Sequence, residues 1–169
     1  MPAIAADSLV ACPGGQRRAR DLAPGDRVIT QGGRGRVLWT GIRQLHGQAL
    51  RDGPSLAPVS VRLGGFGQTN DLRVSPNARV SVAPGQMKRA CELLGTDRAE
   101  ALPTIACAYV MLLFSETEAI RANGVWVECN RPDDPPSAEL AATRAEMFRL
   151  FPSLIRRSPR TRVLRPLLV

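Results

Sequence analysis

The chain contains few of the side chains that metal sites and acid–base sites need. Only one of its 169 residues is a histidine, His46, and its four cysteines are Cys12, Cys91, Cys107 and Cys129. No two cysteines have the Cys-x-x-Cys spacing typical of zinc sites and redox pairs, and a histidine-based metal site would need a second histidine. We therefore expect no metal and no cofactor, and an exposed loop position for His46.

Long apolar segments are also lacking. The longest apolar run, residues 105–114, is far shorter than the roughly 20 residues that cross a bilayer. Residues 1–7 have neither the charged start nor the apolar length of a signal peptide. These absences predict a cytoplasmic protein whose thiols are reduced.

Lysine is nearly absent too, because Lys88 is the only one, so the net charge of +8 comes almost entirely from arginine. The excess is concentrated in residues 151–169, which contain no acidic residue and five arginines: Arg156, Arg157, Arg160, Arg162 and Arg165. These arginines suit an anionic partner, such as nucleic acid or a membrane surface, through phosphate contacts. The lack of interleaved aromatic residues favours the alternative, a solvated extension that packs back on the domain.

What is present is a series of short apolar runs separated by Gly, Pro, Asn and Asp, which predicts an all-β fold. Asn123-Gly124 between two such runs predicts a tight hairpin turn. A proline pair before Ser137 and an apolar face at helical spacing predict one C-terminal amphipathic helix over residues 137–150. The expected strands are residues 8–11, 27–30, 36–39, 59–63, 72–74, 79–82, 105–114, 119–121 and 125–128.

Several motifs occur in an order that resembles the Hint domain, the self-processing fold of Hedgehog proteins and inteins. They are AIAADSLVA at residues 3–11, RDLAPGDRV at 20–28, GRVLWTG at 35–41, DLRVSPNARV at 71–80, YVMLLFSETE at 109–118 and ANG at 122–124. The last two are similar to the bacterial branch of the family. The resemblance implies a pseudo-two-fold, horseshoe-shaped β domain over residues 1–132, followed by the helix and arginine-rich tail over 133–169.

The resemblance also implies an activity, autocatalytic cleavage or splicing, and marks its residues. A cysteine thiol of the family attacks the carbonyl of the preceding peptide bond, and a histidine of the second motif protonates the departing amide. Ala3 stands at the position of the cysteine and Ala78 at that of the histidine, while Ser75 keeps the hydroxyl of the second motif. A methyl group performs neither step, so we expect a catalytically inactive member of the family.

Three alternatives stay open. Alanine at both positions is also what deliberate inactivation would produce, although Met111, Ser115 and Thr117, where the family usually has polar residues or histidine, favour natural loss. Activity could survive through Cys12 or Ser75. The chain could instead be a basic binding module for nucleic acid or another anionic surface.

Overall fold

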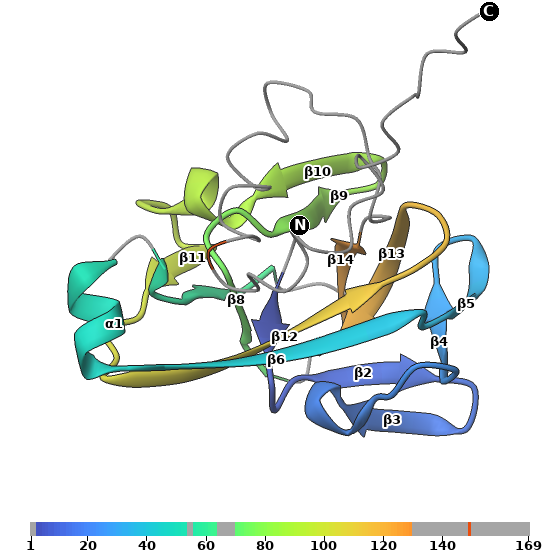
Figure 1. The fold of residues 1–169 in the computed structure, drawn as a ribbon. Coiled ribbons are helices and arrows are strands. Elements are labelled where there is room, and N and C mark those ends of the chain that lie inside the picture. Colours follow the sequence, from blue (N-terminus) through green and yellow to red (C-terminus); the bar gives the residue numbers. More distant parts are fainter. Residues whose placement is uncertain (1–2, 54–55, 64–69, 130–148, 150–169) are drawn as a thin grey trace, which may run out of the picture.

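The structure is a computed structural model that describes residues 3–53, 56–63, 70–129 and 149, and it is built mainly from β-strands (Figure 1). The first sheet contains β1 (Ile4–Ala5), β6 (Trp39–His46), β7 (Val59–Val61), β8 (Leu72–Val74), β11 (Ala99–Ala101) and β12 (Ala106–Leu113). The second contains β2 (Leu9–Cys12), β3 (Gly15–Arg18), β4 (Arg27–Thr30), β5 (Gly33–Arg36), β9 (Arg79–Ala83), β10 (Gln86–Arg89), β13 (Glu118–Ala122) and β14 (Val125–Cys129). The helical elements are α1 (Gly47–Asp52) and the 3-10 turns η1 (Ala19–Asp21) and η3 (Ala90–Leu93). The all-β expectation is confirmed.

Both sheets are antiparallel and mix strands from distant parts of the sequence. The first sheet has the order β11-β7-β8-β1-β12-β6, and the second has β10-β9-β14-β13-β2-β3, with β4 joined to β13 and β5 to β4. The two longest strands, β6 and β12, pair over their full length from Ala106↔His46 to Leu113↔Trp39. The two-residue strand β1 lies between β8 and β12, so the start of the chain is held in the middle of the first sheet.

Two hairpins show the same backbone pattern, which gives the domain an internal pseudo-symmetry. After β2 and β3, the Ala19 N–H donates to the Ser8 carbonyl at 2.8 Å and the Arg20 N–H to the Ala6 carbonyl at 3.0 Å. After β9 and β10, the Ala90 N–H donates to the Ala78 carbonyl and the Cys91 N–H to the Pro76 carbonyl, both at 2.8 Å. In each half a small buried residue, Ala19 or Ala90, lets the 3-10 turn fold back against the hairpin that precedes it.

The expected strands correspond to observed strands except for residues 36–39. Strand β5 ends at Arg36 and β6 begins at Trp39, because the chain crosses between the sheets at residues 37–38. The Val37 backbone bonds to Gly25 and Asp26 in the preceding turn, whereas the Leu38 N–H donates to the Leu113 carbonyl of β12. A continuous strand cannot make both sets of hydrogen bonds, so this expectation is wrong.

The other local expectations have mixed outcomes. The Asn123-Gly124 turn is confirmed, with φ of 46° and 86° at the two residues, values that an Asn-Gly pair adopts readily. His46 is exposed as expected but is the last residue of β6 rather than part of a loop, because its pairing with Ala106 extends the strand. The helix predicted at 137–150 lies outside the described residues except for Arg149, and the arginine tail lies wholly outside them. The boundary after residue 132 stays a prediction.

The buried side chains form two clusters. The larger lies between the sheets and includes Val10, Val28, Val80 and Ile120, each with no exposed surface. The smaller lies against the other face of the first sheet and contains Ala3, Leu45, Leu50, Leu56, Tyr109, Met111 and Leu113, with Trp39 and Cys107 packed against it. Alternate residues of β12 supply much of the smaller cluster, as the period of two predicts. None of the helices in the described part of the chain has the length and apolar character to cross a membrane.

Candidate functional site

The centre of the candidate site is a pair of hydrogen bonds between Ala3 and Ser75. The Ala3 N–H donates to Ser75 Oγ at 3.2 Å, and the Ser75 N–H donates to the Ala3 carbonyl at 2.8 Å. The pairing of Ile4 with Val74 brings the two residues together, because each lies immediately outside the paired strand segment. Ala3 is 1% exposed and Ser75 is fully buried, so both contacts are shielded from water.

Ala78 belongs to the turn that Ser75 opens. Its N–H donates to the Ser75 carbonyl at 2.9 Å, and its own carbonyl accepts from the Ala90 N–H. The Ala78 side chain has no exposed surface and packs in the larger cluster, whereas Ala3 packs in the smaller one. The backbone of residues 75–78 is therefore fixed at a point where the two clusters approach, with no reactive group on residue 78.

The side chains around Ala3 are apolar. Met111 is 1% exposed and Leu113 is 2% exposed, on the same face of β12 as Tyr109. The Tyr109 hydroxyl is buried and donates to the Leu56 carbonyl at 2.8 Å, so its proton is already engaged. Burial raises the pKa of the Cys107 thiol at the edge of the cluster. Among the described residues, no side chain with a carboxylate, amine or imidazole is buried, so none lies within the buried surroundings of Ala3.

The other residues singled out in the sequence lie elsewhere. Ser115 and Thr117 are exposed in the connection that follows β12, while Met111 of the same series is buried within the strand. Cys12 ends β2 in the second sheet, where it packs against the larger cluster and its Sγ lies 3.6 Å from the Val10 carbonyl. Burial raises the pKa of the Cys12 thiol, and the nearby Arg17 offsets only part of this effect. The structure thus joins Ala3, Ser75 and Ala78 through the backbone and places Cys12 in another sheet.

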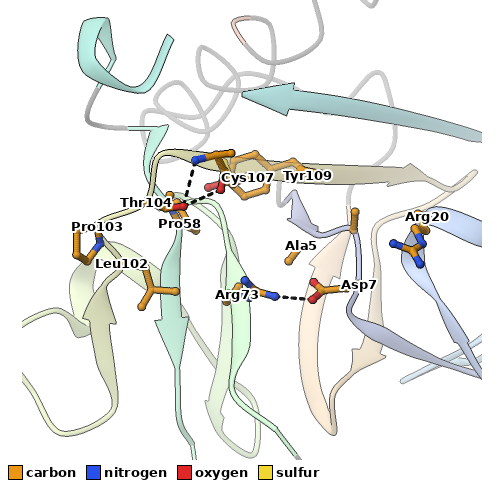
Figure 2. A pocket seen from close by; sticks show the side chains of 13 residues that line it. Ala5, Asp7, Arg20, Pro58, Arg73, Leu102, Pro103, Thr104, Cys107 and Tyr109 are labelled. Atoms are coloured by element: carbon orange, nitrogen blue, oxygen red, sulfur yellow. Dashed lines mark hydrogen bonds and ion pairs between the residues drawn. The ribbon is translucent and has the colours of Figure 1, made fainter. Parts of the chain in front are cut away.

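Sequence reasoning missed a pocket of about 470 Å³ beside the site, on the first sheet. It is lined by Ala5, Arg73 and Tyr109, which lie two residues along the chain from Ala3, Ser75 and Met111, respectively. Cys107 of β12 also lines it. Figure 2 shows Arg73 directed toward Asp7, with 2.5 Å between Nη2 and Oδ2. The pairing of these two residues has no local sequence signal, because 66 residues separate them and only the sheet order brings them together.

The structure has the features of the intein-like autoprocessing folds. These features are two antiparallel sheets, a short first strand held in the middle of one sheet, and a hydrogen-bonded contact between residue 3 and Ser75. A family model described as the Hint domain matches residues 2–134, and the chain belongs to this family. The expected Hint-type all-β fold is therefore confirmed, whereas the C-terminal helix and the arginine-rich tail stay predictions.

Known structures share the fold at low sequence identity. A triply substituted gp41-1 intein has a TM-score of 0.57 and 13% identity over 77% of this chain and 100% of its own. A bacterial intein-like domain from Clostridium thermocellum has a TM-score of 0.55 and 13% identity over 77% and 99% of the two chains. A DnaB intein from Synechocystis has a TM-score of 0.51 and 16% identity over 77% and 99%. No curated protein matches the sequence.

Proposed function

We propose that this chain is a catalytically silent Hint domain, a structural or interaction module that positions the peptide bond before residue 3 without cleaving it. The observation that carries the proposal is the Ala3 N–H, which is a part of that peptide bond and donates to the buried Ser75 Oγ at 3.2 Å. The backbone arrangement of a self-processing site is thus kept around residues that cannot react.

The absence of a nucleophile at residue 3 and of an acid at residue 78 supports a lack of cleavage activity. Cleavage of a peptide bond by this route needs a nucleophile at residue 3 to attack the preceding carbonyl, and Ala3 offers only a methyl group. The departing nitrogen needs a proton, a task worth about 10²–10⁴-fold in rate when an acid is placed correctly. Ala78 provides none.

Ser75 does not replace either group. Its Oγ accepts a hydrogen bond from the Ala3 N–H, which orients the peptide bond but transfers no proton to it. A serine hydroxyl becomes a useful nucleophile only beside a general base, and the described residues include no buried carboxylate, amine or imidazole side chain that could take this role. Ser75 is therefore a positioning residue in this proposal.

The test is a cleavage assay on the full chain fused behind a reporter protein, with and without dithiothreitol. The unaltered chain should stay intact in both conditions, and the double variant Ala3→Cys, Ala78→His should release the reporter at the bond before residue 3. The matched control is Ala5→Cys, Ala78→His, because Ala5 is also buried in β1 and lies two residues further along. Release from that control would show that any buried thiol in β1 suffices.

The result for the unaltered chain is the decisive one. If the unaltered chain released the reporter at the bond before residue 3, the proposal that the domain is catalytically inactive would be refuted. An intact double variant with an unchanged unfolding temperature would refute the positioning part, because the missing groups would then be in place on a correctly folded scaffold.

A further inference from the structure

A cluster of unpaired arginines covers one face of the β4–β5 hairpin. Arg27 of β4 pairs in register with Arg36 of β5, and Arg34 lies two residues before Arg36 on the same face. All three side chains are exposed. We define Arg27, Arg34 and Arg36 as the arginine ribbon.

The ribbon has a rigid support. The opposite face of the hairpin carries Gly35, where an added Cβ would lie 2.8 Å from Thr30 Cγ2 and 3.1 Å from Phe114 Cδ1. Thr30 also pairs with Ile120 of β13, so the hairpin is joined to the second sheet. In Figure 1 the hairpin stands at one end of the molecule beside β13. The three guanidinium groups are therefore presented from a fixed backbone.

The charges of the ribbon are not neutralised. Among the described residues, none forms a hydrogen bond or ion pair with the side chain of Arg27, Arg34 or Arg36. Asp26, the acid next to Arg27, is already bound to Arg17 at 2.9 Å and accepts the Ala23 N–H. The carboxylate of Glu118 lies beside Gly32 at the hairpin turn, near the Thr30 side chain. Glu118 is therefore on the buried side of the hairpin, opposite the arginine ribbon.

Like charges directly opposite each other destabilise a strand pair. Several other arginines of the described residues form ion pairs: Arg62 with Asp71 and Glu100, Arg73 with Asp7, and Arg89 with Glu92. Arg79 and Arg89 also face each other across a strand pair, but each has an acidic partner, Glu128 and Glu92. The Arg27–Arg36 pair has no acidic partner and is thus a local conflict of like charges. Conflicts of this kind are expected at binding surfaces.

We infer that the arginine ribbon binds the phosphate backbone of duplex nucleic acid without reading its sequence. A pair of β-strands such as the β4–β5 hairpin has the dimensions to enter or follow a groove of a duplex. Guanidinium groups bind phosphates through two parallel hydrogen bonds. Single-stranded nucleic acid fits less well, because the ribbon offers no aromatic side chain on which a base can stack. The inference concerns a different surface from the Ala3 site and does not depend on cleavage.

Salt dependence provides the measurement. Each phosphate contact contributes about 0.9 to the slope of log binding constant against log salt concentration, so three contacts contribute roughly 2.7. Binding of the full chain to a fluorescent 30-base-pair DNA duplex would be followed by anisotropy between 50 and 200 mM NaCl. The triple variant Arg27→Gln, Arg34→Gln, Arg36→Gln should lose roughly 2.7 from the slope and unfold at the same temperature or higher.

The matched control is Arg62→Gln, Arg73→Gln, Arg89→Gln, which removes the same net charge from arginines that are already paired. It should keep the slope of the unaltered chain. Equal losses in the two triple variants would overturn the inference, because net charge alone would then explain binding. So would the absence of duplex binding by the unaltered chain, or ribbon-dependent binding that is tighter for vesicles of equal phosphatidylcholine and phosphatidylserine than for the duplex.

Discussion

Replacing Ser75 by alanine should destabilise the domain more than its small size suggests. Ser75 Oγ accepts the Ala3 N–H at 3.2 Å, and both residues are buried, so the substitution leaves an amide donor without a partner and out of reach of water. Such an orphaned buried donor costs about 1–3 kcal/mol. For a chain of this size, a loss of about 2 kcal/mol lowers the unfolding temperature by roughly 4–8 °C.

Urea denaturation and thermal unfolding of Ser75→Ala, compared with Ser81→Ala, measure this effect. Ser81 is the control because its Oγ is a donor to the Ala83 carbonyl on a partly exposed strand, so its removal buries no unpaired N–H. The midpoint for Ser75→Ala should fall with an unchanged denaturant slope, and that for Ser81→Ala should move by less than half as much. Equal shifts would refute the argument, since the Ala3 N–H would then find another partner and Ser75 would not position that peptide bond.

Three further outcomes follow from the second sheet. Gly35→Val should lower the free energy of unfolding by about 1–3 kcal/mol through overpacking, because its Cβ would approach Thr30 to 2.8 Å; chemical denaturation tests this, and an unchanged midpoint would show that the hairpin is not packed closely. Burial raises the pKa of the Cys129 thiol to about 12. As the pH rises from about 9 to 12, this thiol ionises in the unfolded protein but stays protonated in the folded one, so the free energy of unfolding should fall. The substitution Cys129→Ala should flatten this part of the pH profile of stability. Arg36→Thr should raise the unfolding temperature slightly by removing the like charge opposite Arg27, and a lower temperature would contradict the repulsion.

Local chemistry made parts of the fold predictable. The Asn123-Gly124 turn follows from the two residues themselves, which adopt positive φ with little strain. Helix α1 was not predictable in this way, because it begins at Gly47 and its N-terminus has no side-chain cap. Strand β1 has only two residues, and its place in the sheet depends on β8 and β12, which lie about 70 and 105 residues further along the chain.

The candidate site, like the fold, was predictable in part. The identity of Ala3, Ser75 and Ala78 as a group came from the order of motifs, since no periodicity relates residues 3 and 75. The pocket beside Arg73 and Asp7 could not be found, because its lining brings together residues of β1, β8 and β12 and the segments near them, which are far apart in the sequence. Sequence patterns describe neighbours along a strand, whereas the pocket depends on neighbours across three strands.

The hydrogen bonds at the site do not depend on the reactive groups that our proposal treats as lost. The contacts between Ala3 and Ser75, and between Ser75 and Ala78, use backbone atoms and one hydroxyl, none of which belongs to the nucleophile or the acid. Polar catalytic groups in a buried site carry a desolvation cost, whereas Ala3 packs in the apolar cluster with Met111 and carries no such cost. The silent domain of our proposal is therefore expected to be as stable as an active one or more so.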